Sequence, residues 1–394
     1  MKIAIILPTI ISKNGTAKQS LELAKVLSKK GHDVSFFTFA YLKGNSFPEF
    51  EKFRIHFCSD IRKSIIFKFI RNTSILEKIY LYLGLIFISK FRNLFENKEL
   101  DILNPHDWFG IWVVGRLELG DRLIVANIND VPNRVNGSFL EKFKLKMDRK
   151  YFEKVSSLIV LDEKNKTKAM EWLKINSNRI KVARSGIDTV KFKNFKNSFN
   201  LKKQLGIDNN STLFVCANLL ASNRRYEDVL HALKEMKNNS VHLIILSKLD
   251  FDVKYADFLK KIIKDNNLTK NVHFIDKFFS DEERMGYIKN SDVLVFPNSP
   301  QTWGLTVIEA MALGIPVIVS SGSGVSEVLH DKIDALVYSS KNVMQLKEKM
   351  LFCMTHPFAI RDMAKRGRKY ALNNFSWEKF AKEEESIMLE SFKK

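Results

Sequence analysis

The sequence has few cysteines, and nothing in their spacing organises them into a site. Cys58, Cys216 and Cys353 are the three cysteines, and they lie far apart along the chain. No two of them have the spacing of metal ligands, and they indicate no disulfide framework. The sequence therefore predicts free thiols in a reducing compartment.

Signals for membrane insertion and for nucleic-acid binding are also missing. The first residues, 1–11, resemble a signal peptide, but a loop and an amphipathic helix follow without a small-residue cleavage site, which favours a β-strand. The apolar stretch 75–88 is interrupted by Glu77 and Lys78 and is too short to span a bilayer. No zinc-finger spacing and no aromatic RNA-binding string occurs, so no nucleic-acid partner is expected.

Size and charge limit the remaining choices. The chain has 394 residues, 45% of them hydrophobic, which suits two soluble domains, each of about 150–200 residues. There are 64 basic and 44 acidic residues, and the net charge is +20. Such a charge favours polyanionic surroundings, either an anionic membrane face or phosphorylated small molecules.

The first half of the chain alternates between predicted strands and helices. Residues 2–7 form a continuous apolar run, typical of a buried parallel strand. Thr16 and Gln19 have the spacing of a capping box at the start of a helix, and Gly31 suits its end. Further strands are predicted at 33–39, 123–127 and 157–161.

A second alternating series begins after the polar stretch 194–200. Its predicted strands are 212–217, 242–246, 272–275, 293–296 and 316–319; its predicted helices are 226–236, 255–266, 282–290 and 306–313. The fold class is therefore α/β with two doubly wound parallel sheets, whose ligands bind at the carboxyl ends of the strands.

The strongest functional signal is the segment 297–314, which follows a strand and opens an almost wholly apolar helix. That helix contains Glu309, and an ionised carboxylate there is costly unless it is partnered. The two hydroxyls of a ribose could partner it, and so could a Lys or Arg of the same domain. The helix start at Leu305 and Thr306 offers backbone N–H groups suited to a phosphate.

Three further loops carry candidate residues. Gly15 and Thr16 open a helix after the first strand, where backbone can approach an anion, although a simple turn is the commoner outcome. Arg224 and Arg225 could neutralise a diphosphate or form a solvated charge pair. His106 could donate to a phosphate or a sugar hydroxyl, or be a structural histidine.

With these residues in view, the chain resembles the retaining GT-B glycosyltransferases of glycosyltransferase family 4. The resemblance covers nearly the whole length. It is carried by the Gly15–Thr16 loop, His106, the segment RSGID at 184–188, the block PNSPQTWGLTVIEAMALGIPVI from Pro297, SSGSGVSEVL at 320–329 and FSWEKFAKE from Phe375.

The resemblance implies two Rossmann-like domains facing a central cleft. Residues 1–190 would bind the acceptor, residues 191–372 would bind the nucleotide sugar, and 373–394 would form a helix crossing back to the first domain. The family's paired glutamates correspond to Gln301 and Glu309, so one carboxylate is replaced by an amide. The family's Gly-Arg pair is replaced by Ala217 and Asn218, which removes one arginine; Arg225 takes the place of the family's lysine.

The implied reaction is sugar transfer from a nucleoside-diphosphate sugar, with retention at the anomeric carbon and with neither a metal nor a cofactor. The implied catalytic residues are His106, Arg225, Gln301 and Glu309; the implied donor contacts are Gly15, Thr16, Asn218, Arg224, Trp303, Gly304, Leu305 and Thr306. The departing phosphate oxygen would take the acceptor's proton, since no residue is a convincing covalent nucleophile.

The expected acceptor is a glycan or a lipid-linked saccharide bound to the first domain of a cytoplasmic protein. Arg62, Lys63, Lys68 and Arg71 lie among apolar residues, which suits peripheral contact with an anionic inner membrane face, although helices packed on a sheet give the same pattern. Two alternatives remain. Gln301 and Asn218 are compatible with a catalytically weak binding subunit, and a related sugar-nucleotide epimerase would need a carboxylate pair and a histidine that we do not identify.

Overall fold

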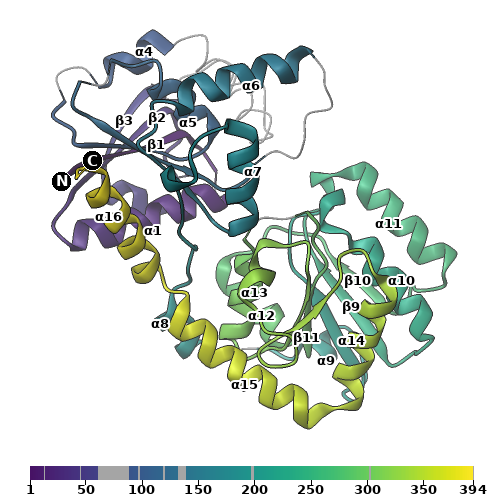
Figure 1. Ribbon diagram of the computed structural model, residues 1–394. Helices are drawn as coiled ribbons and strands as arrows, with labels where there is room; N and C mark the ends of the chain where they lie inside the picture. The colour runs from purple at the N-terminus through teal and green to yellow at the C-terminus, as the bar shows by residue number, and fades with distance from the viewer. Residues whose placement is uncertain are drawn as a thin grey trace. The chain divides into compact units, whose positions relative to one another are not determined.

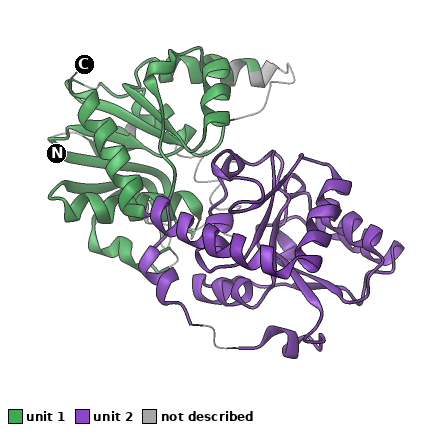
Figure 2. Ribbon diagram, turned by 60° about the horizontal axis from the view of Figure 1, so that its bottom comes forward, with its two compact units in different colours: residues 1–185, 377–394 green, residues 186–376 purple. Residues whose placement is uncertain are grey.

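A computed structural model describes residues 1–12, 14–44, 46–60, 88–95, 98–118, 120–131, 139–196, 199–300 and 303–393. The chain divides into two compact units, drawn in different colours in Figure 2. Unit 1 comprises residues 1–185 and 377–394, and unit 2 comprises residues 186–376. The sequence-based boundaries of 190/191 and 372/373 lie close to these divisions, and the last helix belongs to unit 1.

Unit 1 is a parallel seven-stranded sheet with helices packed on it (Figure 1). Its strand order is β3-β2-β1-β4-β5-β6-β7, and every pair is parallel. The strands are β1 (Lys2–Ile10), β2 (Asp33–Tyr41), β3 (Arg54–Asp60), β4 (Ile102–Pro105), β5 (Leu123–Ile128), β6 (Ser157–Val160) and β7 (Ile180–Val182). The α-helices are α1 (Gly15–Lys29), α4 (Ile88–Asn93), α5 (Trp108–Val114), α6 (Phe139–Phe152), α7 (Glu163–Leu173) and α16 (Trp377–Ser391).

Unit 2 repeats the architecture with six parallel strands in the order β10-β9-β8-β11-β12-β13. The strands are β8 (Thr212–Cys216), β9 (Val241–Leu246), β10 (Val272–Ile275), β11 (Val293–Phe296), β12 (Val317–Ser320) and β13 (Leu336–Tyr338). The α-helices are α8 (Thr189–Asn194), α9 (Leu201–Gln204), α10 (Tyr226–Met236), α11 (Val253–Asp265), α12 (Asp281–Lys289), α13 (Leu305–Ala312), α14 (Val343–Thr355) and α15 (Pro357–Asn374).

The predicted α/β class is confirmed, and the predicted elements lie where the hydrophobic pattern places them. The central strands are buried along their whole length, as β11 and β12 show, because helices cover a doubly wound sheet on both faces. The prediction that the two sheets face a cleft stays a prediction. Cys58, Cys216 and Cys353 are all free thiols, as expected.

The predicted start of α1 is wrong in one respect. The N-cap is Asn14, whose Oδ1 accepts a hydrogen bond of 2.8 Å from the backbone N–H of Ala17. Asparagine is as strong an N-cap as serine or threonine, so it begins the helix two residues before the predicted Thr16–Gln19 capping box. Thr16 instead lies inside the first turn, where its Oγ1 accepts a hydrogen bond of 3.1 Å from Asn129 Nδ2.

Candidate active site

The longest sequence motif forms the loop between β11 and α13 in unit 2. Gly304 is the N-cap of α13 and has a φ of 129°, a conformation that favours glycine. A Cβ atom there would lie 3.0 Å from Val325 Cγ1 and 3.1 Å from Phe296 Cζ. The close turn directs the chain into the helix, which presents the first-turn N–H groups of Leu305 and Thr306. Such a helix start suits a phosphate group.

The loops that follow β8 and β11 meet at the carboxyl edge of the sheet, where these two strands are neighbours. The backbone N–H of Ser299 donates to the carbonyl of Asn223 at 3.0 Å. Thr306 Oγ1 lies 3.3 Å from Asn218 Oδ1. The structure therefore brings together two residues that different motifs predict, Asn218 and Thr306, at the place where an α/β sheet binds its ligand.

Two amides at this edge have buried polar atoms without a hydrogen-bond partner among the described residues. Asn298 is fully buried, and neither Oδ1 nor Nδ2 has a partner among the described residues. Within the same part of the chain Asn218 Nδ2 is also buried without a partner. Leaving a buried donor or acceptor unpaired costs about 1–3 kcal/mol, so polar groups of a ligand are a favourable complement here. Sequence reasoning missed Asn298, although a polar residue just after a buried strand is a usable signal.

The side chain of Trp303 is not available to a ligand. It is only 2% exposed and packs against Phe375, with ring centroids 5.5 Å apart. The prediction that Trp303 contacts the donor is therefore wrong for its indole, because the apolar ring lies in the core. Only its backbone remains as a contact.

Glu309 is paired with Arg284 of α12. Arg284 Nη2 donates to Glu309 Oε1 at 2.9 Å, and Arg284 Nη1 donates to Oε2. Although burial disfavours the arginine's charge, the negative charge of Glu309 and these hydrogen bonds raise the pKa of Arg284. Of the two partners that the sequence left open for Glu309, the structure shows the second, an arginine of the same unit. The side chain is 12% exposed, so part of the carboxylate still reaches the surface.

Arg225 is held by two acids of its own helix. It has a φ of 53° and caps α10, and its Nε and Nη2 donate to the carboxylate of Asp228 at 2.8 and 2.6 Å. Glu227 Oε1 lies 3.3 Å from Nη1. The hydrogen bond with Asp228 raises the pKa of Arg225. The guanidinium is fixed in place, but its charge is already compensated, unlike the unpaired cation that we expect for a diphosphate. Arg224 lies just before it, half-buried, at the end of the turn Ser222–Arg224.

In unit 1, the predicted phosphate loop lies beside a small cavity. The cavity has a volume of about 160 Å³ and is lined by residues 7–9, 14, 16, 17 and 107. Asn14 already bonds the N–H groups of Ala17 and Lys18, whereas those of Gly15 and Thr16 have no partner among the described residues. A Cβ at Gly15 would meet open space, so a ligand can approach its backbone.

Asp107 borders the same cavity and was not predicted to be a site residue. It has a φ of 83° and caps α5, accepting a hydrogen bond of 3.0 Å from Gly110 N. A non-glycine residue in this conformation is uncommon and marks a constrained turn. The loop after β4 thus joins the loop after β1 at the carboxyl edge of the sheet of unit 1.

His106 is fully buried in unit 1. Its Nε2 lies 2.9 Å from Asn104 Oδ1 and 3.2 Å from Asn127 Nδ2, and Asn127 in turn donates to Glu384 Oε2 at 3.0 Å. Burial lowers the pKa of His106 to about 3, so the imidazole is neutral near neutral pH. This burial and these contacts match the second sequence-based alternative, a structural histidine. They disfavour direct hydrogen-bond donation from His106 to a substrate.

Several predicted residues lie outside the described residues. They are Gln301 and the basic residues Arg62, Lys63, Lys68 and Arg71. In the RSGID segment, the N–H of Ile187 donates to the carbonyl of Phe375 at 3.0 Å, and Gly186 does not adopt a positive φ. That segment therefore has a structural role, because it hydrogen-bonds the beginning of unit 2 to its end.

The described residues contain neither a metal-binding cluster nor a membrane-spanning helix. Within those ranges, no group of three or more His, Cys, Asp or Glu side chains could hold a metal ion. No helix in the same ranges has the length and apolar character needed to cross a membrane.

Comparison with known protein families shows which family the chain belongs to. Residues 197–371 match the family described as glycosyl transferases group 1, and residues 13–191 match glycosyltransferase family 4. The chain belongs to glycosyltransferase family 4. As a family 4 glycosyltransferase, it has the candidate phosphate-binding helix start of α13 inside the first of these matches and the Gly15–Thr16 loop inside the second.

This family 4 glycosyltransferase is similar over nearly its full length to several known proteins. A glycosyltransferase of Methanocaldococcus jannaschii is 22% identical, covering 97% of this chain and 96% of its own. The N-acetyl-alpha-D-glucosaminyl L-malate synthase of Bacillus anthracis is 21% identical, covering 98% and 97%. The crystal structure of Anabaena HepE with UDP has a TM-score of 0.77 at 15% identity, covering 99% and 100%. The chain shares the GT-B fold with this solved structure.

Proposed function

We propose that this glycosyltransferase moves a sugar from a nucleoside-diphosphate sugar to a glycan or lipid-linked acceptor, with retention at the anomeric carbon. The observation that carries the proposal is the carboxyl edge of the unit 2 sheet. There Asn218 Nδ2 and both amide atoms of Asn298 are buried without partners among the described residues, beside the start of α13. Solved structures of HepE hold UDP and UDP-glucose, which supports a nucleotide-sugar donor.

The proposed donor contacts follow from this geometry. The N–H groups of Leu305 and Thr306 bind a phosphate at the helix start. Each oxygen of Glu309 accepts one hydrogen bond from Arg284 and retains further acceptor capacity, so the pair can bind a ribose diol with its carboxylate already oriented. From the family resemblance rather than from the geometry, we propose that Gln301 contacts the transferred sugar through its amide.

The proposed chemistry depends on stabilising the diphosphate leaving group. Arg225, oriented by Asp228 and assisted by Arg224, donates hydrogen bonds to the departing phosphate. A departing phosphate oxygen takes the proton of the acceptor hydroxyl, which attacks from the same face. We propose that this requires no metal, so transfer should persist in EDTA. The acceptor is proposed to bind unit 1.

A thermal-shift screen of UDP-, GDP- and ADP-sugars tests donor binding. The matching donor should stabilise the protein by about 2.7 kcal/mol at a hundred times its dissociation constant. Transfer or slow hydrolysis of the bound donor, with and without EDTA, then separates an enzyme from a catalytically weak binding subunit. Absence of binding and turnover across the panel would contradict the proposal.

The variant Asn298→Leu tests the site itself. Because neither amide atom has a partner among the described residues, replacing them with apolar atoms should leave the unfolding midpoint unchanged or higher, while donor affinity falls by about tenfold or more. Asn165→Leu is the matched control, since that buried amide bonds Asp162 Oδ2 at 2.7 Å. The control should lose stability and keep donor affinity. Unchanged donor affinity in Asn298→Leu would contradict donor binding at this edge of the sheet.

A further inference from the structure

Unit 2 contains a cavity at the amino edge of its sheet, opposite the carboxyl edge that holds the proposed donor contacts. Its volume is about 770 Å³. Thr212, Val293 and Pro316 line it, and they lie at or just before the beginnings of β8, β11 and β12. The proposed donor contacts follow the ends of β8 and β11, so the two places are separated by the length of a strand, roughly 15 Å for five residues. This cavity is therefore distinct from the proposed donor site.

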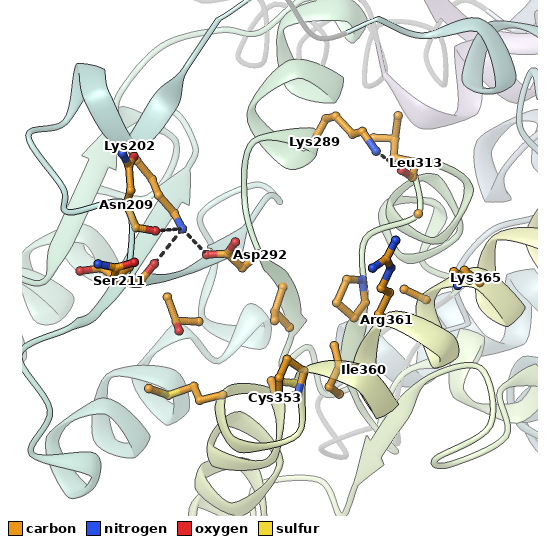
Figure 3. Close-up of a pocket in the computed structure, with 18 of the residues that line it drawn as sticks. Lys202, Asn209, Ser211, Lys289, Asp292, Leu313, Cys353, Ile360, Arg361 and Lys365 are labelled. Carbon is orange, nitrogen blue, oxygen red and sulfur yellow. Dashed lines mark hydrogen bonds and ion pairs between the residues drawn. The ribbon is translucent and has the colours of Figure 1, made fainter.

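One wall of this cavity is electrically balanced. Lys202 Nζ lies 2.9 Å from Asp292 Oδ2 and donates to the carbonyl of Ser211 at 2.7 Å. Figure 3 shows these residues together on one side of the cavity.

The opposite wall carries positive charge without matching carboxylates. Lys289 and Arg361 extend from this side in Figure 3, and Arg368 lines the same cavity. Among the described residues none of these three forms an ion pair with Asp or Glu. Lys289 Nζ donates only to the carbonyl of Leu313, at 2.7 Å, and Arg368 reaches only the carbonyl of Lys193, at 3.5 Å. Lys365, also on this wall, pairs with Asp362 at 3.4 Å.

Besides burial, the repulsion between these cations affects the pKa of Lys289. Burial lowers the pKa of its ammonium group, and the positive charge of Arg368 lowers it further. An anion placed among the three cations would remove that repulsion, and two of them are arginines, whose planar N–H donors match phosphate oxygens. Met354, Pro357 and Ile360 add an apolar surface for the rest of a ligand.

We propose that this cavity binds the phosphate group of a second ligand, held by Lys289, Arg361 and Arg368. Two sources present this chemistry, a free phosphorylated metabolite and a phospholipid headgroup. The inference does not depend on the identity of the donor.

Calorimetric titration of inorganic pyrophosphate into the full-length protein tests the proposal. The double variant Arg361→Gln/Arg368→Gln should weaken binding by about tenfold or more, because it removes two of the three cations that donate charge-assisted hydrogen bonds to the phosphate oxygens. Lys369→Gln, an exposed residue of the same helix that does not line the cavity, is the matched control and should bind as the wild type does. Equal affinity in the double variant and the control would overturn the proposal.

A third variant, Arg225→Gln, distinguishes this cavity from the donor site. Loss of pyrophosphate binding in that variant alone would place the anion at the donor site and would also overturn the proposal. Flotation with phosphatidylcholine vesicles, with and without phosphatidic acid, identifies the source. Vesicle binding that the double variant loses indicates a headgroup, whereas pyrophosphate binding without vesicle binding indicates a free ligand.

A chemical measurement avoids reliance on variants. Amine acylation followed by peptide mass spectrometry should show pyrophosphate slowing the labelling of Lys289 but not that of Lys260, which lies elsewhere and is exposed. Equal labelling rates at Lys289 with and without pyrophosphate would contradict the proposed contact.

Discussion

At the scale of single residues, the pairing of Glu309 with Arg284 decides which roles the carboxylate of Glu309 can have in the site. A carboxylate on an apolar helix predicts a partner, and the fold supplies an arginine from α12 rather than leaving the role to a ligand alone. The pair is only partly buried, with 12% of Glu309 and 25% of Arg284 exposed. The proposed ribose contact therefore depends on an orienting arginine that belongs to no motif in the sequence.

Variants of this pair separate a structural role from a ligand role. Arg284→Met should destabilise the protein by about 1–3 kcal/mol, since it leaves a carboxylate uncompensated among apolar residues. The double variant Arg284→Met/Glu309→Leu should recover most of that loss, because both charges are removed together. Denaturant unfolding measures both values.

Donor affinity gives the second readout for the same variants. The double variant should still bind donor at least about tenfold more weakly, because the hydrogen bonds to the ribose are absent even though the fold is restored. If the double variant binds donor as the wild type does, Glu309 has no ligand role and the pair is purely structural.

At the scale of elements, α16 contributes a buried acid to unit 1. Glu384 is fully buried and accepts a hydrogen bond from Asn127, which lies 3.2 Å from the ring of His106. Burial raises the pKa of Glu384 to about 8. The C-terminal helix is thus joined to the sheet through a neutral polar network.

This network predicts a pH dependence of stability. The folded state binds a proton on Glu384 that the unfolded chain releases above its ordinary pKa of 4.5, so stability falls as pH rises from that value to about 8. His106 acts oppositely, because its lowered pKa costs stability only as pH falls below its ordinary value of 6.5. Between pH 4.5 and pH 6.5 both groups affect stability, in opposite directions. From pH 6.5 to about 8, only Glu384 of these two groups does.

Glu384→Gln tests the prediction between these limits. The variant keeps an acceptor for Asn127 but does not titrate, so its unfolding midpoint should stay flat from about pH 6.5 to 8, where the wild type declines. Glu378→Gln, at an exposed position of the same helix, should retain the decline of the wild type. Parallel pH profiles for all three proteins would contradict the buried neutral carboxyl.

At the scale of the whole molecule, the net charge of +20 is the feature that no single site explains. Long-range attraction to an anionic surface follows from such an excess and weakens as salt screens it. We propose that the protein is cytoplasmic and contacts the anionic inner face of the membrane through Arg62, Lys63, Lys68 and Arg71.

Liposome flotation tests this contact. Binding should require anionic lipid, decrease at high salt, and fall when Arg62, Lys63, Lys68 and Arg71 are all changed to Gln, because about 1 kcal/mol is lost for each basic residue near the surface. Four exposed lysines of unit 2, Lys254, Lys260, Lys261 and Lys264, changed in the same way give a charge-matched control. If flotation does not depend on anionic lipid, the proposed membrane contact is contradicted.

The sequence by itself determined the two parallel sheets, nine of the thirteen strands that the structure describes and the position of α13, but not β3, β4, β7 or β13. Continuous apolar runs are buried on both faces only in such sheets, and helical periodicity and a closing glycine define the helices between them. It also determined the family, since the block from Pro297 is long and specific.

Only the tertiary structure decided which partner each polar group meets. The salt bridge of Glu309 with Arg284 and the burial of His106 beside Asn127 depend on side chains from separate segments, and so does the lack of a partner for the Asn298 amide among the described residues. The basic cavity at the amino edge of unit 2 likewise gathers Lys289 of α12 with Arg361 and Arg368 of α15. Periodicity specifies which face of an element is buried, whereas charge pairing depends on which faces meet.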